Sequence, residues 1–79
     1  MMRIKVIPLI GPRKLLSVEA NPDTLVYHLK EAICSRIGIP TDNMRLSYRG
    51  KVLNEIKTLS EQGVEEEETY FLFPQGEGG

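Results

Sequence analysis

The strongest constraint on the fold of this chain is the order in which two hydrophobic periodicities follow one another. Apolar and polar residues alternate in residues 3–10, 15–20, 44–53 and 69–73, which is typical of strands with one buried face. Residues 26–37 instead repeat apolar side chains at helical spacing. The order strand, strand, helix, strand, strand packs most economically as an α+β fold, in which a mixed sheet of about four strands wraps over one amphipathic helix.

The first two alternating stretches predict a β-hairpin. Ile4 and Val6 share one face of the first strand. Pro8 has no N–H group to donate to a ladder, so it marks the end of that strand or an edge position. Residues 11–14 have the composition of a turn, and the alternation resumes after them.

The helix is bounded by signals at both ends. Asp23 or Thr24 is the predicted N-cap, and Gly38 is predicted to follow the helix as its C′ residue, with Pro40 preventing continuation. The apolar face consists of four residues: Val26, Leu29, Ile33 and Ile37. Three polar residues are expected to fall off that face: Lys30, Glu31 and Arg36.

The last strand is expected to present different residues to the core and to solvent. Tyr70 and Leu72 share one face, which leaves Phe71 and Phe73 on the solvent side. Pro74 ends the strand because it cannot donate a backbone hydrogen bond.

Length and composition exclude several classes of function. The 79 residues form a single domain, expected at residues 1–74, followed by a flexible C-terminal tail at residues 75–79. Ten basic residues against eleven acidic ones leave no basic stripe for nucleic acid, and no apolar run is long enough to cross a membrane. The N-terminus lacks the features of a signal peptide and Cys34 is a lone cysteine, so the expected location is the cytoplasm.

No group of residues predicts catalysis. His28 and Cys34 lie on one helix, where their separation gives an angular offset of about 600°, so they are expected to face different sides. No second histidine, paired carboxylate or metal-ligand spacing accompanies them. We therefore expect that the chain is not an enzyme and holds no metal or cofactor. The run at residues 65–68, four glutamates, is expected to be a solvated turn.

A series of residues in the second half of the chain matches a known pattern: Gly38-Ile39-Pro40, Asp42, Arg45-Leu46, Gly50-Lys51, Leu53, Thr58-Leu59-Ser60 and Gly78-Gly79. In this order the series resembles the ubiquitin family. The match runs from Gly38 to Gly79 without a gap, whereas the N-terminal half matches more loosely and carries an extra residue between Thr24 and Leu29. The divergence from ubiquitin itself favours a distinct modifier or a prokaryotic relative, with an archaeal homologue as our expectation.

The resemblance implies the β-grasp fold and the role of a small protein modifier. In such modifiers the C-terminal glycine is adenylated by an ATP-using activating enzyme, passed as a thioester to enzyme cysteines and joined to a lysine of a target. Gly79 would be the acyl donor, and Gly78 beside it would fit a narrow channel because it has no side chain. The implied partners are the activating enzyme, a conjugating enzyme, a ligase, a processing or deconjugating protease and target lysines. The chain itself is expected to be a monomer that binds no ATP.

The resemblance also assigns roles to individual side chains. Lys51 resembles a lysine used for chain building, and Lys30 matches a second family lysine, although its place beside the core favours a structural role. Gln75 and Glu77 replace arginines of the ubiquitin tail, which favours a dedicated activating enzyme.

A patch for binding partners is predicted on the outer side of the last strand. Phe71 and Phe73 form its centre, with Arg45 and Arg49 at its rim. Ser47 belongs to the same face but stands where the family pattern leads one to expect isoleucine.

Two other functions remain open from the sequence. A sulfur carrier also ends in Gly-Gly and receives sulfur as a thiocarboxylate, but such carriers usually lack the series of matching residues described above. A non-conjugated ubiquitin-like binding domain of a larger protein is the second alternative.

Overall fold

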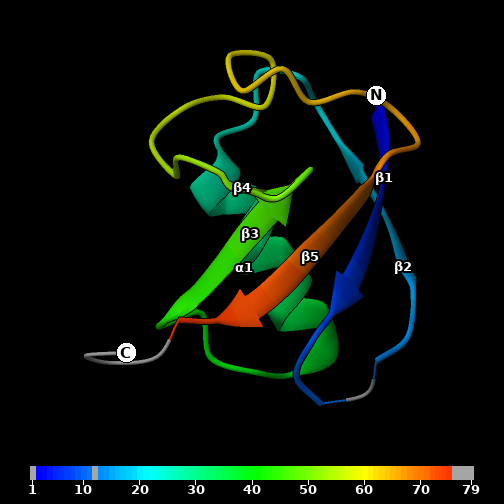
Figure 1. The fold of residues 1–79 in the computed structure, drawn as a ribbon, viewed down its shortest axis with the longest axis vertical. Coiled ribbons are helices and arrows are strands. Elements are labelled where there is room, and N and C mark those ends of the chain that lie inside the picture. Colours follow the sequence, from blue (N-terminus) through cyan, green and yellow to red (C-terminus); the bar gives the residue numbers. More distant parts are fainter. Residues whose placement is uncertain (1, 12, 76–79) are drawn as a thin grey trace.

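One helix and five strands form within residues 2–11 and 13–75, which are the residues that the computed structural model describes (Figure 1). Their bounds are β1 (Met2–Pro8), β2 (Leu16–Ala20), α1 (Val26–Ile37), β3 (Met44–Tyr48), β4 (Lys51–Val52) and β5 (Thr69–Pro74). The predicted α+β arrangement of a mixed sheet over one helix is confirmed. The sheet gains the short β4 because the chain turns back on β3 directly after Tyr48.

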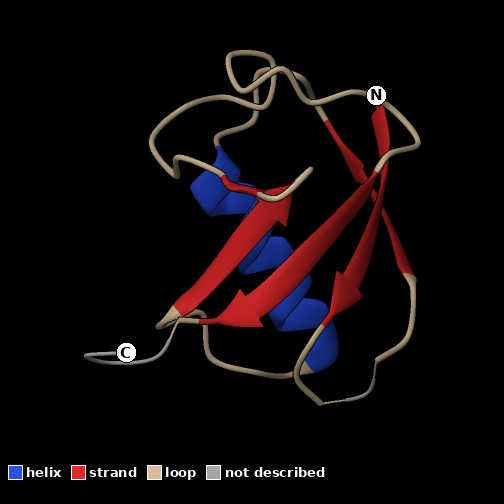
Figure 2. Ribbon diagram, in the orientation of Figure 1, coloured by secondary structure: helices blue, strands red, loops and turns tan. Residues whose placement is uncertain are grey.

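The strand order in the sheet is β2-β1-β5-β3-β4. The central strands β1 and β5 come from opposite ends of the chain and pair in parallel, whereas the other neighbours are antiparallel. Helix α1 crosses one face of this sheet, and a long loop joins β4 to β5 (Figure 2). The helix therefore covers only one face, and side chains of β3 and β5 that point the other way lie on the outer face.

The core forms where the inner face of the sheet meets the helix. Ile4 and Val6 of β1 and Tyr70 and Leu72 of β5 are all fully buried, which confirms the alternation predicted for both strands. Pro8 is the last residue of β1, so the prediction that it marks the end of a strand is also confirmed. The burial of these side chains fixes which face of β5 is left for contact with other molecules.

Helix α1 begins without a side-chain cap. It follows Leu25, and its first N–H groups bond to backbone carbonyls of the loop after β4. Val26 N–H donates to the carbonyl of Lys57 (2.9 Å), and Tyr27 N–H donates to the carbonyl of Glu55 (3.1 Å). The loop thus supplies acceptors for N–H groups that a helix leaves unpaired at its start.

The predicted N-cap at Asp23 or Thr24 is therefore wrong. Both residues belong to a turn that precedes the helix: Asp23 N–H donates to Asn21 Oδ1 (2.9 Å), and the Thr24 hydroxyl accepts from Asn21 N–H (3.3 Å). The physical reason is competition for the helix N–H groups, because carbonyls from a distant part of the chain occupy the places that a side chain would take.

The C-terminal end of the helix lies where the sequence predicted it, whereas the burial of one helical side chain, Lys30, differs from its prediction. Gly38 follows the helix in the left-handed conformation, with φ of 75°, and its N–H donates to the carbonyl of Cys34. Glu31 and Arg36 are exposed as expected. Lys30 was expected to lie off the apolar face but is buried, with only 6% of its surface exposed. Its burial is possible because Glu55 neutralises the ammonium group.

Candidate functional site

The outer face of β3 and β5 brings the predicted patch residues together. Phe73 lies opposite Arg45 and Phe71 lies opposite Ser47 in the antiparallel ladder. Side chains of directly opposite residues share a face and lie close enough to contact. Phe71 is 37% exposed, while Phe73, Arg45 and Ser47 are half-buried. We call Arg45, Ser47, Phe71, Phe73 and the neighbouring Val52 the outer-face surface.

Val52 was missed by the sequence reasoning. It pairs with Ser47 on the side away from β5 and is exposed, so Phe71, Ser47 and Val52 form one row across three strands. The signal was present in the sequence, because a two-residue turn at Arg49-Gly50 places Val52 opposite Ser47. The row sets a small hydroxyl between two apolar side chains.

Arg49 makes its contacts away from Phe73. Its guanidinium lies 5.2 Å from the ring centre of Tyr48, and its Nη2 and Nε donate to Glu68 Oε1 at 2.7 and 3.2 Å. The Tyr48 hydroxyl donates to the same oxygen (3.3 Å). The hydrogen bonds from Arg49 are the main cause that lowers the pKa of Glu68. These contacts connect Arg49 to Glu68, the residue directly before β5. The place of Arg49 at the rim of a partner site stays a prediction.

The two predicted linkage lysines have very different surroundings. Lys51 is exposed at the start of β4. Lys30 Nζ lies 2.8 Å from Glu55 Oε2 and 5.4 Å from the ring centre of Tyr27. An amine must be free of its proton and open to the incoming thioester before it can attack, so reaction at Lys30 requires this ion pair to break. The use of either lysine for chain linkage stays a prediction.

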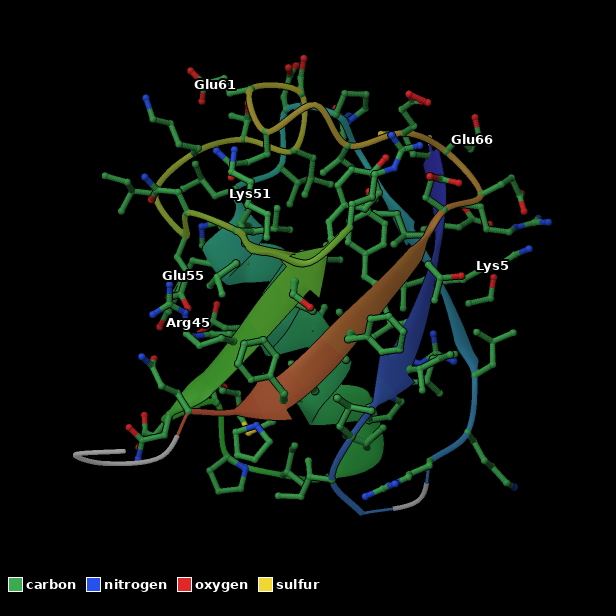
Figure 3. All side chains as sticks on the ribbon, viewed as in Figure 1. Lys5, Arg45, Lys51, Glu55, Glu61 and Glu66 are labelled. Atoms are coloured by element: carbon green, nitrogen blue, oxygen red, sulfur yellow. The ribbon has the colours of Figure 1, made fainter. Side chains whose placement is uncertain are left out.

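The start of the C-terminal tail is tied to the domain. Gln75 N–H donates to the carbonyl of Asn43 (2.6 Å), and Arg45 Nη1 donates to Gln75 Oε1 (3.0 Å). Arg45 Nε in turn lies 3.3 Å from Glu55 Oε2 (Figure 3). Three other predicted site residues, Glu77, Gly78 and Gly79, lie outside the described residues.

The side chains considered for catalysis are separated. His28 is exposed and bonds to Glu31 (3.4 Å), whereas Cys34 is fully buried, and burial raises the pKa of its thiol. Within residues 2–11 and 13–75, no group of three or more His, Cys, Asp or Glu residues could hold a metal ion. No helix in this part of the chain is long and apolar enough to cross a membrane.

A mixed sheet wrapped over one helix, with parallel first and last strands at its centre, defines a β-grasp protein. The sequence profile of the ubiquitin family matches residues 4–73. The chain belongs to the ubiquitin family, which confirms the resemblance found in the sequence.

The similar proteins differ in how much of their own length this chain matches. The NEDD8-like protein RUB1 of Saccharomyces cerevisiae is 38% identical over 60 residues, which cover 76% of this chain and 75% of RUB1. The E3 ubiquitin-protein ligase parkin of Rattus norvegicus is 34% identical over 50 residues, covering 63% of this chain but only 11% of parkin. Among solved structures, the ubiquitin of Caldiarchaeum subterraneum superposes with a TM-score of 0.84 at 31% identity and covers 99% of this chain and 98% of its own.

Proposed function

We propose that this protein is a ubiquitin-like modifier that is joined to lysines of target proteins through the carboxyl group of Gly79. The carboxylate is a weak electrophile, so an activating enzyme must first convert it to an acyl-adenylate, using ATP and releasing pyrophosphate. A cysteine thiolate then displaces AMP to form a thioester. A target lysine displaces the thiol and forms an isopeptide bond.

Family membership supports this proposal most strongly. The ubiquitin profile matches residues 4–73, and the NEDD8-like relative aligns with three quarters of its own length. Gly78-Gly79 follow the last strand closely, since β5 ends at Pro74. The outer-face surface on that strand offers Phe71, which is exposed, and Phe73, which is half-buried, as side chains that enzymes of the pathway can bind.

Mass spectrometry of proteins from the source cells tests the proposal. Trypsin is unsuitable because its last cleavage would follow Lys57 and leave a long remnant on each target. A glutamate-specific protease cleaves after Glu77 and leaves only Gly78-Gly79 on the modified lysine. The matched control is a strain whose chain lacks Gly79. We expect Gly-Gly lysines that disappear in the control strain.

Two other results would contradict conjugation. A thiocarboxylate at Gly79 without modified lysines would identify a sulfur carrier, because sulfur would then be the group that the activated glycine receives. If neither Gly-Gly lysines nor a thiocarboxylate are found, Gly79 does not take part in acyl transfer. Gly-Gly on Lys51 would further show that chains form, and this result tests the linkage prediction separately.

A ubiquitin-like binding domain is the second candidate function. It is favoured by the matches to segments of longer proteins, since the aligned part is 11% of parkin and 39% of ubiquitin-like protein 4A of Anoplopoma fimbria. Such a domain would act through its surface alone. In the experiment above it corresponds to the outcome with neither Gly-Gly lysines nor a thiocarboxylate.

A further inference from the structure

The two edges of the sheet differ in length. In the strand order β2-β1-β5-β3-β4, one edge is β4, with two residues, and the other is β2, with five. Figure 1 shows β2 at the border of the sheet next to β1. A strand at an edge has a row of N–H and C=O groups without a neighbouring strand, and this row can pair with a strand of another molecule. The longer row of this kind lies on β2.

Ser17 and Glu19 form the open row of β2. In an antiparallel ladder the N–H and C=O groups of one residue point to the same side, and successive residues point to opposite sides. The Ser17 carbonyl accepts a hydrogen bond from Arg36, which is not part of β1, so the backbone groups of Ser17 point away from β1. Those of Glu19, two residues on, point the same way. Both residues are exposed, and in the described part of the chain no other hydrogen bond reaches their outward groups.

Arg36 approaches this edge from the helix. It lies in the last turn of α1, where a cation interacts favourably with the helix dipole. Helix α1 starts at the loop after β4, to which its first N–H groups bond, and it crosses the sheet toward β2 (Figure 1). There Arg36 Nη1 donates to the Ser17 carbonyl oxygen at 2.7 Å. The exposed Arg36 side chain therefore lies beside the open edge.

The position of Arg36 conflicts with strand pairing at Ser17. An incoming strand lies about 4.8 Å from its neighbour and brings an N–H group to about 2.9 Å from the carbonyl oxygen that accepts from it. Arg36 Nη1 already holds such a position at Ser17. A hydrogen bond from a charged donor is stronger than one from a neutral backbone N–H group. An incoming strand would thus have to displace a stronger donor than the one it brings.

The open row of β2 matches a second copy of itself. If two copies run antiparallel with Val18 opposite Val18, Ser17 of each copy lies opposite Glu19 of the other, and the outward groups of each such pair can exchange two hydrogen bonds. No like charges then lie opposite one another within the strands. Lys14 precedes the strand and Asp23 follows it, so the antiparallel arrangement brings basic and acidic ends together. Strand β2 also contains no proline, which would prevent pairing.

We propose that Arg36 keeps this protein monomeric by blocking the edge of β2, and that the partner which this edge accepts once Arg36 is removed is β2 of a second copy of the chain. The pairing surface consists of the outward backbone groups of Ser17 and Glu19. This inference does not depend on the proposed function, because it involves no residue of the C-terminal tail.

Four variants and a control test the role of Arg36. Arg36→Met removes the charge and the donors, and Arg36→Gln does so with a shorter polar side chain. Arg36→Lys keeps a charged donor. The fourth variant combines Arg36→Met with Ser17→Pro, since proline has no N–H group to offer a second strand and is tolerated where that group faces away from the sheet. The matched control is Arg3→Met, which removes the same charge from an exposed arginine of β1.

Sedimentation equilibrium of the full chain over a series of concentrations measures the Kd of the dimer. We expect Arg36→Met and Arg36→Gln to dimerise with a Kd about tenfold or more below that of the wild type. Amide hydrogen exchange followed by NMR should show protection of the Ser17 and Glu19 N–H groups that increases with concentration. Arg36→Lys, Arg3→Met and the variant with Ser17→Pro should remain monomeric like the wild type.

Several results would overturn the proposal. If Arg36→Met and Arg36→Gln stay monomeric at every concentration, Arg36 does not block the edge. Dimerisation of Arg36→Met alone would trace association to the added apolar side chain. A dimer that persists with Ser17→Pro, or that leaves the Ser17 and Glu19 amides unprotected, would use another surface. Urea unfolding of each variant establishes that the associating chains are folded, and a wild-type chain that itself dimerises through β2 would show that the edge is open.

Discussion

Lys30 illustrates how a distant residue decides the place of a single side chain. Helical periodicity alone puts it beside the apolar face, and a charged side chain there is expected to reach solvent. The structure buries it because Glu55, in the loop after β4, lies 2.8 Å from its ammonium group. The sequence could not show this pairing, since nothing local to either residue indicates that the loop folds back onto the start of the helix.

The two members of this ion pair should differ in how much the fold depends on them. Glu55→Gln leaves the Lys30 ammonium buried without its anion, which we expect to cost about 3 kcal/mol of unfolding free energy. Lys30→Met should cost less, about 1 kcal/mol, because Glu55 keeps Arg45 at 3.3 Å and is partly exposed. Urea unfolding at pH 7 measures both values. Lys51→Met is the control, since Lys51 is exposed, and a larger loss for Lys30→Met than for Glu55→Gln would contradict this account.

The two ends of helix α1 show which element boundaries a sequence can predict. Gly38 was predicted correctly because its left-handed conformation and its bond to Cys34 depend on the helix alone. The start was not, because Lys57 and Glu55 supply carbonyls from a separate segment. A capping residue in the sequence is a local signal for the start of a helix. It does not predict the start correctly where backbone carbonyls from another segment accept from the same N–H groups.

A side-chain capping arrangement occurs in the turn that begins at Thr58, within the segment between β4 and β5. Thr58 N–H donates to Glu61 Oε1 (2.9 Å), and Glu61 N–H donates to the Thr58 hydroxyl (3.1 Å), as in a capping box. We therefore expect Thr58→Ala to cost about 1 kcal/mol. Asp23→Ala should change stability by less than about 0.5 kcal/mol, because the Asp23 carboxylate does not cap the helix.

Thermal unfolding compares the two substitutions directly. In a domain of this size a loss of 1 kcal/mol lowers Tm by about 4–8 °C, so the expected loss for Thr58→Ala is well resolved. Thr24→Ala serves as a second probe of the sequence-based cap, because its hydroxyl accepts from Asn21 N–H in the turn that precedes the helix. A larger decrease in Tm for Asp23→Ala than for Thr58→Ala would show that Asp23 does cap the helix in solution.

At the scale of the whole molecule, strand periodicity and strand order differ in how well they can be predicted. Alternation identified the buried residues of β1 and β5, since the side-chain period of a strand depends only on the strand. The pairing of Val6 with Tyr70, at opposite ends of the chain, leaves no local signal in the sequence and was not predicted. The hydrogen bond between Arg45 and Gln75 was missed for the same reason, because it joins a residue near the start of β3 to the residue that follows β5.

The outer-face surface makes a prediction about the molecule as a binding partner. Phe71 and Phe73 lie on the face of the sheet opposite the core, so their truncation should lower partner affinity more than it lowers the stability of the fold. We expect Phe71→Ala or Phe73→Ala to weaken the tightest partner by about 2 kcal/mol or more, which is about thirtyfold in Kd. Partners are first captured from source cells on the immobilised wild-type chain, and their Kd values are then measured by calorimetry for each variant.

The control must remove an exposed apolar side chain elsewhere. Leu15→Ala is suitable, because Leu15 is exposed next to β2, at the opposite edge of the sheet from β4. Urea unfolding of all three variants separates lost affinity from lost stability. Equal weakening by Leu15→Ala would mean that general hydrophobicity, and not this face, holds the partner. Unchanged Kd values for both phenylalanine variants would show that partners bind elsewhere, and the exposure of Phe71 would then need no functional explanation.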